Sequence, residues 1–140
     1  EFDIDLARSQ SNDNPVFYVQ YAHARICSVF KQLAEKGGVH DIALGLASLA
    51  RLDTEEEKTL LTALARYPEL LRVAAANRTP HTLAFYLQEL AAALHGYYNQ
   101  HKFLVDDAAL QAARLTLIRA THAVLRGALG LLGVTPKDAM

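Results

Sequence analysis

Two phenol rings and one guanidinium recur at helical spacing in the segment of residues 15–36. Tyr18, Tyr21 and Arg25 stand at positions i, i+3 and i+7, which share one face of a helix next to its apolar stripe. Bases of single-stranded RNA stack on such rings, and arginine contacts phosphates or stacks on planar groups. The same tyrosines can also be packing residues at the edge of a core, with their hydroxyls in water. The spacing leaves base stacking and packing open.

A polar segment, SQSNDN at residues 9–14, directly precedes this aromatic face. Serine, asparagine and aspartate favour loops because their side chains hydrogen-bond to the nearby backbone. A loop of this kind can also hydrogen-bond the edges of bases without a large positive charge. The candidate contacts in this loop are Ser11, Asn12, Asp13 and Asn14.

A second aromatic and polar pair, Tyr98 and Asn99, comes near the end of the helix that we expect over residues 80–102. The preceding Tyr97 falls on the apolar stripe of that helix, so we expect it in the core. Tyr98 projects roughly 100° further round the helix, beside Asn99. Tyr98 is therefore the candidate at the surface.

Three further side chains, Arg119, His122 and Arg126, line up at i, i+3 and i+7 on the last predicted helix. This basic stripe could meet phosphates, but His122 also belongs to an apolar stripe. Arginines usually lie on a solvated helix face. The sequence does not decide the role of these three residues.

Patterns typical of catalysis or metal binding are scarce. Cys27 follows His23 by four residues, which formally places a thiol near a base. No charged neighbour in the sequence completes that pair, and a cysteine on an apolar stripe is usually an inert small hydrophobe. The six histidines form no i, i+4 pair around a carboxylate, and no glycine-rich phosphate loop is present. We expect no catalytic residue and no metal site, and we predict a binding or structural module.

Length and composition indicate one globular domain. The 140 residues are 51% hydrophobic and 21% charged, and no apolar run reaches the about 20 residues of a membrane span. A single cysteine excludes an internal disulfide and suits a reducing compartment. The net charge of −1 does not indicate a nucleic-acid binder, so an RNA contact would need a local patch. Because Glu1 opens without a Met or a domain start signal, we expect a piece of a longer chain.

Helices must position these side chains, because the apolar residues recur with helical and not strand periodicity. The predicted helices span residues 15–36, a shorter stretch within 39–52, then 54–67, 68–78, 80–102 and 107–134. Their starts carry helix signals, which are Asn14-Pro15, a Thr54/Glu57 capping box, Thr79-Pro80, and Asp106 or Asp107.

The last predicted helix, residues 107–134, has apolar stripes on more than one side. A helix of this kind needs neighbours on several sides, so we expect it at the centre of the fold. The connection at residues 102–105 is short, which places this helix antiparallel to the one before it. The predicted fold class is all-α, an antiparallel helical bundle with a central C-terminal helix.

The stretch DNPVFYVQYAHARICSVF, residues 13–30, resembles the start of the C-terminal anticodon-binding domain of bacterial arginyl-tRNA synthetases. In that family a Tyr-Val-Gln-Tyr-Ala-His-Ala-Arg core follows a polar loop. The closing stretch AARLTLIRATHAVLRGALGLLGVTPKDAM is similar to the family's terminal helix and tail. EEKTLLTALARYPELL and YLQELAAALHGYYNQHKFL are similar to its middle helices. The likeness covers essentially the whole chain except the segment near residues 39–52.

The chain departs from the family pattern at its motifs. The domain type is named for an Asp-Ala-Leu-Arg motif, which residues 107–111 (DAALQ) only approximate, with Arg114 further on. The His-Ile-Gly-His and Lys-Met-Ser-Lys-Ser type motifs of class I catalytic domains are absent. The resemblance therefore implies a parent enzyme that joins arginine to its tRNA with ATP and Mg. It also implies that these 140 residues are themselves catalytically inactive and need no cofactor.

Position by position, the resemblance places the loop Ser11–Asn14 beside the anticodon loop of the tRNA. It implies that Tyr18, Tyr21 and Tyr98 are aromatic contacts. It also implies that the C-terminal tail through Met140 lies near the anticodon bases.

The implied partners are the anticodon arm of tRNA-Arg and the enzyme's own catalytic domain, with no DNA and no membrane. Residues 1–14 are expected to be a connector from that catalytic domain, residues 15–140 the bundle, and the location cytoplasmic. Two rival functions stay open. One is the equivalent bundle of another class I synthetase, of cysteinyl or glycyl type. The other is a helical protein–protein interaction module.

Overall fold

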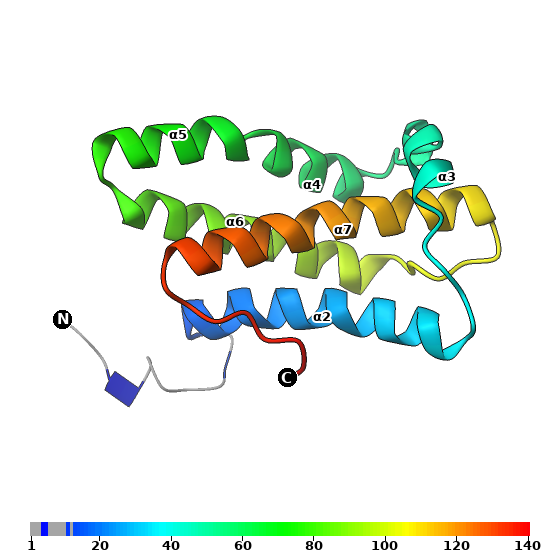
Figure 1. Cartoon of the computed structure of the whole chain (residues 1–140), viewed down its shortest axis with the longest axis horizontal. Coiled ribbons are helices and arrows are strands. Elements are labelled where there is room, and N and C mark those ends of the chain that lie inside the picture. Colours follow the sequence, from blue (N-terminus) through cyan, green and yellow to red (C-terminus); the bar gives the residue numbers. More distant parts are fainter. Residues whose placement is uncertain (1–3, 6–10, 12) are drawn as a thin grey trace.

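The structure of the protein, a computed structural model, describes residues 4, 5, 11 and 13–140. These residues form a bundle of helices without a strand (Figure 1), and none of their helices is long and apolar enough to cross a membrane. The elements are α2 (Pro15–Glu35), α3 (Ile42–Ala47), the short 3-10 helix η1 (Leu49–Arg51), α4 (Glu55–Ala65), α5 (Tyr67–Asn77), α6 (Pro80–Gln100) and α7 (Ala108–Leu131). The predicted all-α class is confirmed. The predicted connector at residues 1–14 lies mostly outside the described residues.

Side-chain caps account for most of the helix starts. Asn14 caps α2, where its side-chain oxygen accepts a hydrogen bond from a backbone N–H. Thr54 and Glu57 form the predicted capping box at the start of α4, and Asp107 caps α7. Thr79 makes no side-chain cap, so the preorganised ring of the proline after it is the local start signal of α6.

Helix α7 lies at the centre of the bundle, as predicted. It contacts α2, α3, α4, α6 and η1, and Figure 1 shows it between α2 on one side and α4 and α5 on the other. It runs antiparallel to α6, which confirms the arrangement expected from their short connection (Figure 1). Its buried residues point to several sides: Ala112, Ala113, Arg114, Leu115, Leu117, Ile118, Thr121, Leu125, Ala128 and Leu129.

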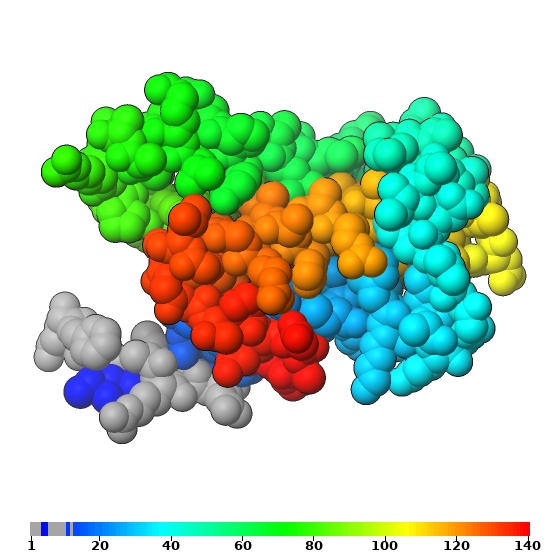
Figure 2. Space-filling view, viewed as in Figure 1, coloured from blue at the N-terminus to red at the C-terminus, as the bar shows by residue number. Residues whose placement is uncertain are grey.

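The C-terminal tail after α7 folds back over α2. Gly133, with a φ of +74°, follows the last turn of α7 and takes the left-handed conformation that ends the helix. Nε2 of Gln20 donates to the carbonyl oxygen of Thr135 at 2.9 Å. A ring nitrogen of His23 lies 2.6 Å from the carbonyl oxygen of Lys137. Figure 2 shows the tail packed against α2 and the end of α7. The tail therefore belongs to the folded body.

An ion pair lies inside the core. Nε of Arg114 donates to Oε2 of Glu57 at 2.9 Å, and the hydroxyl of Tyr97 donates to the same oxygen at 2.6 Å. Nη1 of Arg114 donates to the carbonyl oxygen of Lys102 at 2.8 Å. Tyr97 is fully buried, which confirms its predicted place in the core. The network joins α4, α6 and α7, and it satisfies the charges that the core encloses.

Candidate nucleic-acid interface

The predicted residues of two helices meet around the guanidinium of Arg25. Its Cζ atom lies 4.4 Å from the ring centroid of Tyr21 and 4.4 Å from that of Tyr98, distances typical of cation–π contacts. Its Nη1 approaches Oδ1 of Asn99 at 3.5 Å. With Tyr18, these residues form what we call the tyrosine–arginine site: Tyr18, Tyr21, Arg25, Tyr98 and Asn99. The sequence predicted each member, and the structure brings them together.

Two neighbouring helices position the site. Helix α2 supplies Tyr18, Tyr21 and Arg25 on the face that the i, i+3, i+7 spacing predicts, and α6, which packs against α2, supplies the other two members. Both α2 tyrosines are partly buried. Packing and an accessible ring are therefore compatible here, because each ring contacts the bundle and keeps part of its surface in solvent. In the described part of the chain, Arg25 has no carboxylate within ion-pairing distance.

His95, a buried residue of α6, packs against the inner side of the site. The sequence analysis did not identify it. Its ring centroid lies 4.6 Å from that of Tyr18 and 5.3 Å from that of Tyr21. Nη1 of Arg25 donates to its Nδ1 at 2.9 Å, while its Nε2 donates to the backbone carbonyl of Tyr18 at 3.1 Å. Burial lowers the pKa of His95 and the Arg25 charge adds to this, against the opposing effect of the Tyr18 carbonyl. A signal existed, because His95 stands three and four residues before Tyr98 and Asn99.

A cavity of about 280 Å³ opens beside Arg25. Tyr21, Tyr98 and Lys31 line it, together with the tail residues Asp138 and Met140. The side chain of Met140 is half exposed. The structure thus places the tail residue that the resemblance singled out next to the tyrosine–arginine site.

The residues of the polar loop before α2 differ in their exposure to solvent. Ser11 and Asp13 are exposed, and Asn12 lies outside the described residues. Asn14 is only 6% exposed, and its side-chain oxygen is used for the helix cap. This burial weighs against Asn14 as a contact to bases, whereas the exposed positions remain predictions.

The basic stripe on α7 does not form one cationic face. Arg119 lies over the ring of Phe30, with Cζ 3.9 Å from the ring centroid. Arg126 approaches Asp138 of the tail at 3.9 Å, and His122 turns toward α2, where it stacks on His23. Each of the three side chains has a different partner within the protein.

Cys27 has neighbours that its sequence context did not reveal. Nε2 of His122 lies 3.5 Å from its sulfur, and Oδ1 of Asp138 lies 3.8 Å from it. Burial raises the pKa of the thiol and the Asp138 charge raises it further, so the protonated form is favoured. Burial lowers the pKa of His122, and His23 and the two nearby arginines lower it further. The expectation that no charged group completes the pair of Cys27 and His23 was therefore wrong, because long-range packing brings Asp138 to it.

The family of the chain follows from its sequence. Residues 19–140 match the DALR anticodon-binding domain, and the chain belongs to this family. It is 56% identical over 140 residues to the arginine–tRNA ligase of Halorhodospira halophila, 51% to that of Coxiella burnetii and 49% to that of Legionella pneumophila. In each case all of this chain is covered, but only 24% of the relative. The chain thus spans about a quarter of the length of the curated relatives it matches.

Solved structures show the same likeness. The crystal structure of a protein described as an arginyl-tRNA synthetase from Campylobacter jejuni superposes with a TM-score of 0.83 at 31% identity, covering 100% of this chain and 30% of that one. The arginyl-tRNA synthetase of Thermus thermophilus gives 0.75 at 32% identity, covering 99% of this chain and 23% of that one. These relatives do not favour a cysteinyl or glycyl type bundle or an interaction module without an RNA role.

Proposed function

We propose that the tyrosine–arginine site and the cavity beside it contact unpaired bases in the anticodon arm of tRNA-Arg. The observation that supports this most is the contact of one guanidinium with two tyrosine rings from different helices, which holds both rings at the rim of a cavity. Stacking on preorganised rings costs less side-chain entropy than stacking on mobile ones. Within the described residues, Nε and Nη2 of Arg25 have no hydrogen-bond partner and can donate to a phosphate or a base edge.

The finer parts of this function follow from the relatives. The whole protein would join arginine to tRNA-Arg with ATP and Mg in the cytoplasm, and the catalytic domain would be the bundle's second partner. The bundle itself would recognise tRNA and carry no catalytic residue. The purified 140-residue chain is then expected to bind tRNA-Arg without arginylating it.

Replacement of Tyr21 tests the proposal. Tyr21→Ala is expected to weaken tRNA-Arg binding by about 1–3 kcal/mol, the size of one base–aromatic stack. The loss should shrink when the tRNA carries an altered anticodon, because the contact to the bases is then already impaired. Phe85→Ala is the matched control, since Phe85 is 62% exposed on α6 but lies outside the site. Equal binding by Tyr21→Ala and the wild type would remove the site from the interface.

A further inference from the structure

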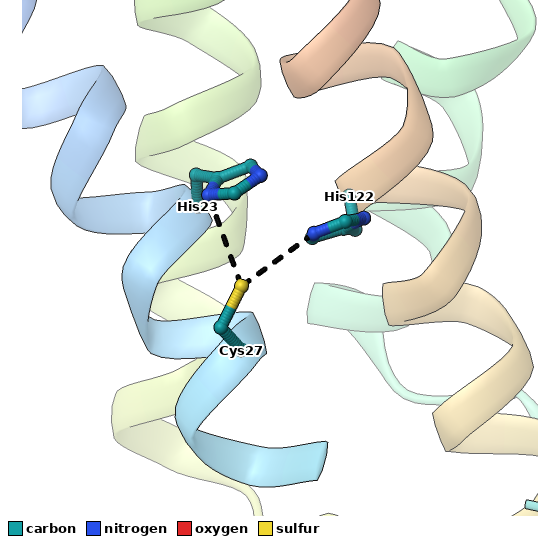
Figure 3. A group of neighbouring side chains, drawn as sticks. All are labelled: His23, Cys27 and His122. Atoms are coloured by element: carbon teal, nitrogen blue, oxygen red, sulfur yellow. Dashed lines mark hydrogen bonds between the residues drawn. The ribbon is translucent and has the colours of Figure 1, made fainter. Parts of the chain in front are cut away.

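A second group of polar side chains lies between α2 and α7, beneath the C-terminal tail. His23 and Cys27 come from α2 and His122 comes from α7, and Figure 3 shows the three converging on one point. One donor atom of each residue lies within 4.8 Å of those of the other two. The stacking proposed for tRNA uses neither histidine, and Cys27 only lines the cavity, so the arrangement of the three side chains needs another explanation.

The spacing of the donors resembles the edges of a tetrahedral zinc site. Sγ of Cys27 lies 3.5 Å from Nε2 of His122 and 3.8 Å from Oδ1 of Asp138. Zinc bound at about 2.3 Å from sulfur and about 2.0–2.1 Å from nitrogen or oxygen keeps its ligands roughly 3.4–3.6 Å apart. Small side-chain movements would therefore bring these donors into contact with one ion.

His23 provides an independent observation. Its side chain is completely buried, and Nε2 has no hydrogen-bond partner among the described residues. Nδ1 lies 2.6 Å from the carbonyl oxygen of Lys137 and must donate to it, which leaves the lone pair on Nε2. A buried acceptor without a donor costs free energy. Histidines that bind metals commonly donate their other N–H to a backbone carbonyl, as His23 does here.

We propose that His23, Cys27 and His122 bind a zinc ion, with Asp138 of the C-terminal tail as the fourth ligand. The donors are Nε2 of His122, the Cys27 thiolate, one carboxylate oxygen of Asp138 and Nε2 of His23, a closed four-coordinate set of the kind that zinc prefers. The His23 ring must turn to present Nε2, because Nδ1 is the ring nitrogen that now faces the cluster, 3.8 Å from the sulfur. Binding releases the thiol proton to solvent. The pattern of histidines in the sequence did not reveal this site, because His122 comes from a helix that lies ninety-five residues further along the chain.

A zinc ion at this site would fix the position of the C-terminal tail. Asp138 is 77% exposed, so its hold on the bundle is weak without a stronger ligand bond. Asp138 and Met140 both line the cavity of the tyrosine–arginine site. A zinc ion would therefore tie the tail to α2 and α7 and fix one wall of that cavity.

Titration with Co²⁺ tests the site, because tetrahedral Co²⁺ with a thiolate ligand has strong visible and near-ultraviolet bands. The purified wild-type protein is expected to gain these bands at one equivalent and to lose them when Zn²⁺ is added. Cys27→Ser, which is nearly isosteric, and His122→Ala should lose them. His81→Ala should keep them, since His81 is exposed on α6 outside the cluster. The helical circular dichroism of each variant shows that it is folded. Bands of equal strength in wild type and Cys27→Ser, or none in the wild type, would overturn the proposal.

The role of the tail has its own readout. Asp138→Asn is expected to weaken Zn²⁺ binding at least about tenfold, whereas Asp53→Asn, at an exposed aspartate away from the cluster, should leave it unchanged. Zn²⁺ should also slow amide hydrogen exchange in residues 135–140 of the wild type and not of Cys27→Ser. Unchanged affinity in Asp138→Asn together with unchanged exchange would show that the tail supplies no ligand.

Discussion

The guanidinium of Arg25 donates to Nδ1 of His95 across 2.9 Å, and this bond links α2 to α6 inside the candidate RNA interface. It requires a neutral ring with its proton on Nε2, where the ring donates to the carbonyl of Tyr18. Protonation of Nδ1 would place a second positive charge next to the guanidinium, and the two charges would repel each other. The geometry of the aromatic rings around Arg25 therefore depends on the protonation state of one buried histidine.

The stability of the protein is expected to depend on pH through His95. Burial and the Arg25 charge lower its pKa in the folded state, against the effect of the Tyr18 carbonyl, so below about pH 6.5 the unfolded chain takes up the proton first. The contribution is present in full above that pH and is lost as the pH falls toward the folded pKa. His95→Leu should cost about 1–3 kcal/mol near neutral pH, and this difference should shrink at lower pH.

Denaturant unfolding of wild type and His95→Leu at a series of pH values measures this difference. His81→Leu serves as the control for the change from histidine to leucine, because His81 is exposed and lies outside the site. A constant gap between wild type and His95→Leu would mean that His95 is protonated equally in both states.

Arg25 and lysine should not be interchangeable. The planar guanidinium contacts the rings of Tyr21 and Tyr98 at 4.4 Å each while it donates to His95, which a lysine ammonium cannot do in one position. Arg25→Lys keeps the charge, so it is expected to weaken tRNA-Arg binding by about 1 kcal/mol, the size of a cation–π contact. Arg72→Lys, at an exposed i, i+3 ion pair on α5, should not change binding. If Arg25→Lys binds as wild type does, the charge alone and not the ring geometry matters.

The buried pair of Glu57 and Arg114 should carry much of the stability. Arg114→Met leaves a buried carboxylate without its ion-pair partner, and we expect a loss of about 3–5 kcal/mol in the free energy of unfolding. Breaking the exposed pair of Arg72 and Glu69 with Arg72→Met should cost far less, because exposed ion pairs contribute little to stability. Urea unfolding of both variants measures the contrast. Similar losses in the two would place Arg114 in an environment that water still reaches.

Local signals in the sequence predicted the frame of the fold, while packing between distant residues decided the chemistry. The two residues of the capping box, Thr54 and Glu57, are only three positions apart, so the box could be predicted directly from the sequence. The ion pair between Glu57 and Arg114 could not be predicted in this way, because the two residues are fifty-seven positions apart. The contact between Cys27 and Asp138 could not be predicted either, for the same reason. The tyrosine–arginine site was predictable in part. The sequence shows the α2 members at helical spacing and the α6 members as an adjacent pair, but it does not show which faces of the two helices meet.

Binding of tRNA by the purified chain should show a shallow salt dependence. The net charge is −1, and Arg25 and Lys31 are the cations that line the cavity. Two phosphate contacts to a single-stranded segment predict a slope of log K against log salt of about −1.4. Lys31→Met should reduce the slope by about 0.7. Lys58→Met, at an exposed lysine that pairs with Glu55, should leave the slope unchanged. A slope steeper than about −4 would require several further phosphate contacts, and the aromatic rings would then supply only a minor share of the affinity.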